Sequence, residues 1–287
     1  AHALLPETAL LAAWSALIYG VAVGRRHGRR GGVAIGLALA ALTLGLRGLP
    51  DLAAGLFIVA LPLLSPAWTG REYRRAVLLG LGGAAGLILV GILVMANAGE
   101  MTAWLAEHGA SRYLLMRSPG SAYSELPWFA WPLWPLAAWA VWHAHRRLPR
   151  TPELHPPLVA LAALLLAVLF PAWSRDGALL PVLLPLALLS AHAVENLRRG
   201  AAQAFYWFGV LCFLFFVLAF WVYFSAIEWG APTKLAAQVA RLTPAYRPGG
   251  VETGALLVAG AATLIWLVAI PLFPRAKTRP VLVWATG

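Results

Sequence analysis

A small set of ionisable side chains lies at the ends of long apolar runs, and these are the residues that could do chemistry. Along the chain they are Glu7, Arg47 with Asp51, Glu107 and His108 with Arg112 and Arg117, and Arg175 with Asp176. Ionisable groups at the ends of membrane spans are functional candidates because placing them inside a helix bundle is costly. The alternative is that each side chain is solvated at the lipid headgroups or is paired with its neighbour.

Arg47 differs from the other candidates because it is a lone cation in a short turn, residues 45–50, between two apolar runs. A guanidinium can grip a phosphate with two hydrogen bonds, which suits Arg47 to a phosphate at headgroup depth. A carboxylate such as Glu7 could deprotonate or orient an acceptor, or it could hold a divalent cation. These roles stay open for Glu7, and a divalent cation is the one cofactor that the residues suggest.

The composition excludes most other chemistry. No Walker A motif, helix-opening GxGxxG turn, HExxH or GxSxG is present, and a single cysteine, Cys212, excludes a disulfide framework and a multi-cysteine metal site. Hydrophobic residues make up 61% of the 287 residues and charged residues 11%, whereas a soluble domain carries about 25% charged residues. A water-soluble globular enzyme and a disordered chain are therefore excluded. The fold class expected is all-α, a polytopic bundle of transmembrane helices.

A spanning helix needs about 20 mostly apolar residues, and nine runs of the sequence qualify as candidates. The predicted spans are 8–24, 33–46, 52–68, 77–96, 128–145, 157–173, 178–194, 203–225 and 253–273. Gly82 and Gly86 in the fourth span have the spacing that lets helix backbones approach closely. The spans predict a single transmembrane domain over residues 1–287. We expect it to be a piece of a larger protein, because the sequence begins without Met and ends in another apolar run.

Basic residues fall on alternate connections between the predicted spans. Fifteen of the 22 Lys and Arg residues lie in five connections, at Arg25 to Arg30, Arg71 to Arg75, Arg146 to Arg150, Arg198 and Arg199, and Arg275 to Arg279. Eight of the 11 acidic residues lie in the other connections. The positive-inside rule then places the basic connections in the cytoplasm and the first residue outside. The net charge of +11 is thus an orientation signal, and no nucleic-acid partner is expected.

Two of the outer connections, 97–127 and 226–252, are long enough to hold structure of their own. The pattern predicts a surface helix over 100–116 in the first, with Trp104 and Leu105 towards the lipid or the bundle. In the second it predicts an interfacial helix capped by Thr233. Its two faces are Lys234, Gln238 and Arg241 on the polar side and Leu235, Val239 and Leu242 on the apolar side.

Four motifs follow one another along the chain. They are an acidic residue opening a span at Ala3–Leu11, a span ending in Leu-Arg-Gly at Gly36–Gly48, the loop Glu107–Arg112 with the Pro-aromatic segment Pro127–Pro132, and a basic residue before a Leu-Leu-Pro span at Ser174–Leu189. In this order they resemble the membrane domain of bacterial lipid-linked-sugar transferases of the GT-C class. The likeness is closest to the aminoarabinose transferase that modifies lipid A, and looser to protein O-mannosyltransferases. Glu7 and Arg47 stand where that family usually has Asp and Lys, and its leading catalytic acid is expected before residue 1.

The resemblance implies transfer of a sugar from a polyprenyl-phosphate donor to a lipid or protein acceptor at the periplasmic face of the bacterial inner membrane. It implies a catalytic role for Glu7. The residues that it implies for substrate binding are Arg47, Glu107, His108, Arg112, Arg117 and Arg175. Cations at these positions would stabilise the negative charge of the departing lipid phosphate. The partners expected are the donor, the acceptor and membrane lipids.

Two other classes of function compete with this interpretation. A transporter or flippase for a lipid or an anionic solute would favour ionisable residues near the membrane midplane and inverted repeats. Neither occurs in this sequence, because every strong charge lies at the end of a span. A non-catalytic membrane scaffold is the third possibility, and a chain without the leading catalytic acid would permit it.

Overall fold

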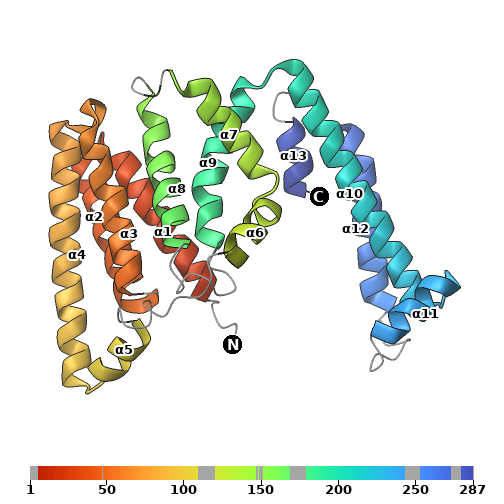
Figure 1. The fold of residues 1–287 in the computed structure, drawn as a ribbon, viewed down its shortest axis with the longest axis horizontal. Coiled ribbons are helices and arrows are strands. Elements are labelled where there is room, and N and C mark those ends of the chain that lie inside the picture. The colour runs from red at the N-terminus through yellow and green to blue at the C-terminus, as the bar shows by residue number, and fades with distance from the viewer. Residues whose placement is uncertain are drawn as a thin grey trace. The chain divides into compact units, whose positions relative to one another are not determined.

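A computed structural model describes residues 6–46, 48–108, 120–146, 148, 151–168, 179–242, 253–272 and 279–286. Within these residues the chain consists of helices and turns, with no strand, which confirms the all-α class. The chain divides into two compact units, Ala1–Ala193 and Val194–Gly287. Figure 1 shows the helices of both units.

The described residues of unit 1 form eight α-helices and the start of a ninth. They are α1 (Pro6–Gly24), α2 (Gly28–Ala41), α3 (Leu49–Ala60), α4 (Arg71–Asn97), α5 (Met101–His108), α6 (Gly120–Phe129), α7 (Leu133–Ala144), α8 (His155–Val168) and α9 (Leu180–Asn196). Four short helical segments connect them: the π-helix η1 (Leu42–Leu46) and the 3-10 turns η2 (Leu61–Leu64), η3 (Pro66–Trp68) and η6 (Pro152–Leu154).

Unit 2 consists of α10 (Arg199–Glu228), α11 (Thr233–Leu242), α12 (Thr253–Leu272) and α13 (Arg279–Thr286). The helix α13 packs on α10 through Trp284, whose ring lies 5.4 Å from that of Phe205 and 5.2 Å from that of Phe213. The predicted interfacial helix over 233–242 is present as α11, and the carbonyl of Pro232 accepts a hydrogen bond from Ala236 N–H in its first turn. No residue of α11 is buried, as expected of a helix at an interface.

Among the residues that the structure describes, three helices, α4, α10 and α12, are long and apolar enough to cross a membrane. Four shorter apolar helices lie at Thr8–Gly24, Leu49–Leu64, Pro152–Ala167 and Leu180–Val194. The predicted span 52–68 is broken after Ala60, because Pro62 and Pro66 cannot donate the hydrogen bonds of a continuing α-helix. The predicted span 128–145 is likewise interrupted before α7 begins at Leu133. In these two segments a proline-rich stretch ends the helix, so neither apolar run forms one continuous spanning helix.

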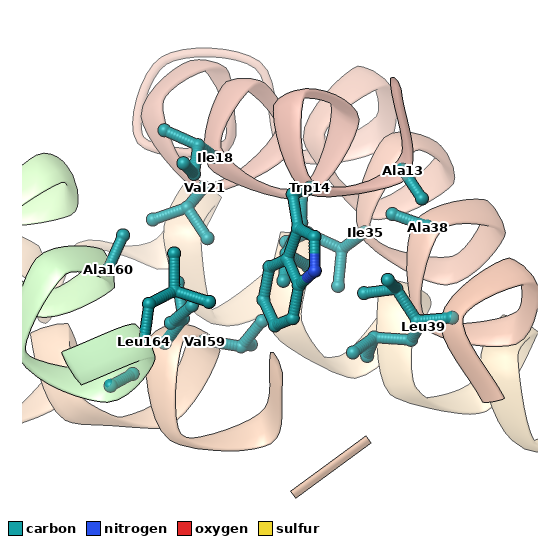
Figure 2. Close-up of a cluster of buried hydrophobic side chains, with 14 of the residues drawn as sticks. Ala13, Trp14, Ile18, Val21, Ile35, Ala38, Leu39, Val59, Ala160 and Leu164 are labelled. Atoms are coloured by element: carbon teal, nitrogen blue, oxygen red, sulfur yellow. The ribbon is translucent and has the colours of Figure 1, made fainter. Parts of the chain in front are cut away.

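The core of unit 1 is formed where α1, α2, α3 and α8 meet. Figure 2 shows the ring of Trp14 at its centre, between Leu39 of α2 and Leu164 of α8. All three side chains are fully buried. Because lipid is as apolar as these residues, contacts of this kind stabilise a membrane bundle mainly through close packing.

Glycines allow the close packing of α2 against α1 and against α4. A Cβ on Gly31 would lie 2.3 Å from Cα of Gly24, and a Cβ on Gly80 of α4 would lie 2.6 Å from Cγ2 of Ile35. The close approach predicted at Gly82 and Gly86 does not occur within the described residues, since nothing lies within 4 Å of either position. Glycine spacing alone could not show which face of α4 turns towards α2.

Replacing Gly31 by Ala is expected to destabilise unit 1 by about 1–3 kcal/mol, because the methyl group collides with backbone rather than with a flexible side chain. The matched control is Gly82→Ala, in the interior of α4 with open space around it. That change should be neutral or should stabilise by up to about 1 kcal/mol through the better helix propensity of Ala. Thermal unfolding of both variants in one detergent measures the difference. Equal midpoints would contradict the packing of α1 on α2.

A hydrogen-bonded link joins η3 to the start of α8. Trp68 Nε1 donates to His155 Nδ1 at 2.9 Å, and His155 Nε2 lies 2.8 Å from the carbonyl oxygen of Leu148. Since an indole only donates and a carbonyl only accepts, His155 must be neutral with its proton on Nε2. Tyr73 packs edge-on against the Trp68 ring at 4.9 Å, and the Arg25 guanidinium lies 5.8 Å from its centroid.

The variant His155→Phe should lose about 1–3 kcal/mol of stability, because it leaves the N–H of the fully packed Trp68 without its acceptor. In a Trp68→Phe background the same change should cost less, since the orphaned donor is gone. Chemical unfolding of the two single variants and the double variant gives this comparison. Strict additivity of the two changes would show that the hydrogen bond contributes nothing to stability.

Candidate functional site

The turn that carries Arg47 has an unusual backbone on both sides. Leu42–Leu46 forms a π-helix, and Gly48, with φ of 84°, donates from its N–H to the Leu42 carbonyl at 3.1 Å. A positive φ suits Gly because it has no Cβ. Single turns of π-helix are frequent at functional sites. The chain therefore passes from α2 through the π-helix, and α3 begins at Leu49, directly after the buried Gly48.

The helix α5 is attached to this turn. Trp104 Nε1 donates to the carbonyl oxygen of Leu44 in the π-helix at 3.1 Å. Leu44 also packs against α4, since a Cβ on Gly91 would lie 2.6 Å from Leu44 Cδ1. The predicted surface helix over 100–116 is thus present over Met101–His108, with Trp104 turned towards the bundle. The part over 109–116 lies outside the described residues.

The structure brings together the elements that carry or flank several of the predicted site residues. Glu7 lies in the first turn of α1, and Glu107 and His108 end α5. The first turns of α1 and α3 and the helix α5 lie at the same end of unit 1, the lower end in Figure 1. The starts of α2 and α4, which carry basic clusters, lie at the opposite end.

The predicted contacts among these groups remain predictions. Arg47, Arg112, Arg117 and Arg175 lie outside the described residues, as do the side chains of Glu7, Glu107 and His108. Within the described residues, no group of three or more His, Cys, Asp and Glu side chains is placed to hold a metal ion.

Asp51 is fully buried, although the sequence pattern placed it with Arg47 among charges at the headgroups. It lies in the first turn of α3, two residues after Leu49, where the positive end of the helix dipole favours a carboxylate. The side chain is not isolated there, as expected for a carboxylate whose burial would otherwise be costly. Its place in a first turn, directly before an apolar run, was the one sequence signal for this burial. Asp51 is therefore a buried carboxylate, close in sequence to Arg47.

No family model, curated protein or solved structure matches this chain. The function is accordingly inferred from its own residues.

Proposed function

We propose that this chain is the membrane domain of a GT-C class glycosyltransferase, which transfers a sugar from a polyprenyl-phosphate donor to a lipid or protein acceptor at the periplasmic face of the bacterial inner membrane. The observation that carries the proposal is the hydrogen bond from Trp104 to Leu44. It holds the helix that ends in Glu107 and His108 against the π-helix that precedes Arg47. Two segments of the predicted site, 60 residues apart in sequence, are thereby joined.

The chemistry of such a site follows from the donor. Its polyprenyl tail stays in the bilayer, so its phosphate lies at headgroup depth, within reach of cations such as Arg47 and Arg175. The nucleophilic oxygen of the acceptor attacks the anomeric carbon, and the bond from that carbon to the phosphate oxygen breaks. The lipid phosphate leaves with the electron pair, and fixed cations stabilise its charge. Glu7 takes the proton of the acceptor. Alternatively, Glu7 would hold a divalent cation, which would polarise the acceptor oxygen, and water would take the proton.

The proposal requires the predicted topology of nine spans with the first residue outside. In a Cys212→Ser background, a Gly120→Cys variant should react with a membrane-impermeant thiol reagent in intact cells. The control is Thr69→Cys, in a basic connection, which should react only after the inner membrane is permeabilised. The reverse pattern would contradict the orientation, and with it a periplasmic site.

The activity itself is tested by incubating the full-length protein with a panel of polyprenyl-phosphate sugars and measuring free polyprenyl phosphate. Release of the lipid phosphate together with transfer of the sugar to an acceptor is the expected result. Movement of the intact donor between leaflets of a vesicle, with no cleavage, would instead identify a flippase. If a folded protein neither cleaves the donor nor moves it between leaflets, the result would favour a non-catalytic scaffold.

A further inference from the structure

A second site is suggested by an apolar cavity of about 710 Å³ that runs along α7 and is walled by α6, α8 and α9. Its volume lies within the range of roughly 300–1,000 Å³ that small-molecule sites occupy. From Trp134 to His145 the α7 side of the cavity extends about 16 Å, at 1.5 Å per helical residue. The Trp134 indole donates to the Pro127 carbonyl at 3.1 Å, so the wall at that end offers no free donor from this ring. A long apolar chain is the kind of ligand that such walls accept.

The two ends of the cavity differ in charge. At one end His145 lines it, and Arg146 follows directly in sequence. At the other end the wall includes Leu126, and the adjacent Glu125 is exposed. An anionic group therefore finds a complementary charge at the His145 end and a repelling one at the Glu125 end.

Hydrogen bonds of His145 tie Arg146 to a residue that lines the cavity. His145 Nδ1 donates to the carbonyl of Trp142, since that carbonyl can only accept, and Nε2 then accepts from Arg146 Nε at 3.3 Å. Within the described residues Arg146 makes this one hydrogen bond, which leaves its two Nη groups for another acceptor. Two parallel N–H groups of a guanidinium match the oxygens of a phosphate.

We propose that this cavity binds one acyl chain of an anionic glycerophospholipid, with the lipid phosphate on Arg146. The bilayer supplies such a lipid directly, and basic pockets between transmembrane helices are known to bind anionic headgroups. The site lies apart from the proposed transferase site, because the end of α7 at Arg146 and the helix α5 are at opposite ends of unit 1 (Figure 1). In the orientation proposed above, the lipid belongs to the cytoplasmic leaflet.

Native mass spectrometry of the purified full-length protein in detergent tests this proposal, with phosphatidylglycerol and phosphatidylcholine of identical acyl chains as probes. The expected result is about tenfold tighter binding of phosphatidylglycerol, because its headgroup carries a net negative charge, whereas Arg146 repels the cationic choline group of phosphatidylcholine. Arg146→Gln should remove this preference by weakening phosphatidylglycerol binding more than phosphatidylcholine binding. Ala138→Phe, which fills the cavity from α7, should weaken binding of both lipids. The matched controls, Arg199→Gln and Ala261→Phe on unit 2, should change neither.

Three outcomes would overturn the proposal. Arg146→Gln with an unchanged preference for phosphatidylglycerol would show that the phosphate is not held there. Unchanged lipid binding by Ala138→Phe, or by the smaller Ala138→Leu if the first variant fails to fold, would show that the acyl chain lies elsewhere. Displacement of phosphatidylglycerol by an equal concentration of polyprenyl phosphate would identify the cavity as a polyprenyl site. None of these results depends on transferase activity, so the proposed function can fail separately.

Discussion

Replacing Arg47 by Gln should reduce sugar transfer about 10- to 150-fold in the intact protein. On the proposed function, the change would remove both the charge and the bidentate hydrogen bonds that Arg47 is proposed to make to the donor phosphate. A charge-assisted hydrogen bond contributes roughly 1.5–3 kcal/mol. Each 1.36 kcal/mol corresponds to a factor of ten in rate. Arg47→Lys keeps the charge and should fall between wild type and Arg47→Gln. Donor affinity and turnover, normalised to folded protein, are the quantities to measure.

The matched control for Arg47 is Arg74→Gln, an exposed arginine in the first turn of α4, which should leave transfer unchanged. Glu7→Gln should reduce turnover more than donor affinity if Glu7 serves the acceptor or a metal ion. The competing interpretation is that Arg47 only anchors a helix end beside Asp51. On that interpretation Arg47→Gln alters stability slightly and the rate hardly at all. Transfer at the wild-type rate by Arg47→Gln would end the assignment of a phosphate site.

Removing the buried carboxylate of Asp51 should destabilise unit 1 by about 3–5 kcal/mol in the variant Asp51→Ala. The side chain is fully buried in the first turn of α3 and is not isolated, so its removal costs both its packing and its interaction in the interior. Asp51→Asn keeps the shape and part of the hydrogen-bonding capacity, and it should cost less. Thermal unfolding in detergent, followed by circular dichroism, measures both changes.

The control for Asp51 is Glu100→Ala, an exposed acid just before α5, which should change stability by no more than about 0.5 kcal/mol. Similar effects at the two positions would contradict a structural role for the buried carboxylate. A double-mutant cycle of Asp51→Asn with Arg47→Gln asks whether these two side chains interact. A coupling energy near zero would contradict the competing interpretation that Arg47 anchors the helix end through Asp51.

The sequence by itself determined the class of this protein and many of its helix positions. A composition with 61% hydrophobic and 11% charged residues predicted helices suited to an apolar environment, because an α-helix pairs its backbone groups within one segment. Local pattern also located α11 at Thr233–Leu242, with polar and apolar faces set by a 3.6-residue period. These properties depend on residues close together in the chain, which is why they can be read without a structure.

The tertiary structure decided which local signals were used. On α4 it placed Gly80, rather than Gly82 and Gly86, in the contact with α2. The rotation of α4 about its axis is set by the helices that pack on it and not by the spacing of its glycines. The tertiary structure also buried Asp51 and attached Trp104 to Leu44 across 60 residues. Hydropathy and periodicity depend only on the residues of one segment, and they predict whether that segment is helical and which of its faces is apolar. The burial of a charge and the choice of a helix face depend on contacts between segments, and these form only when the bundle assembles.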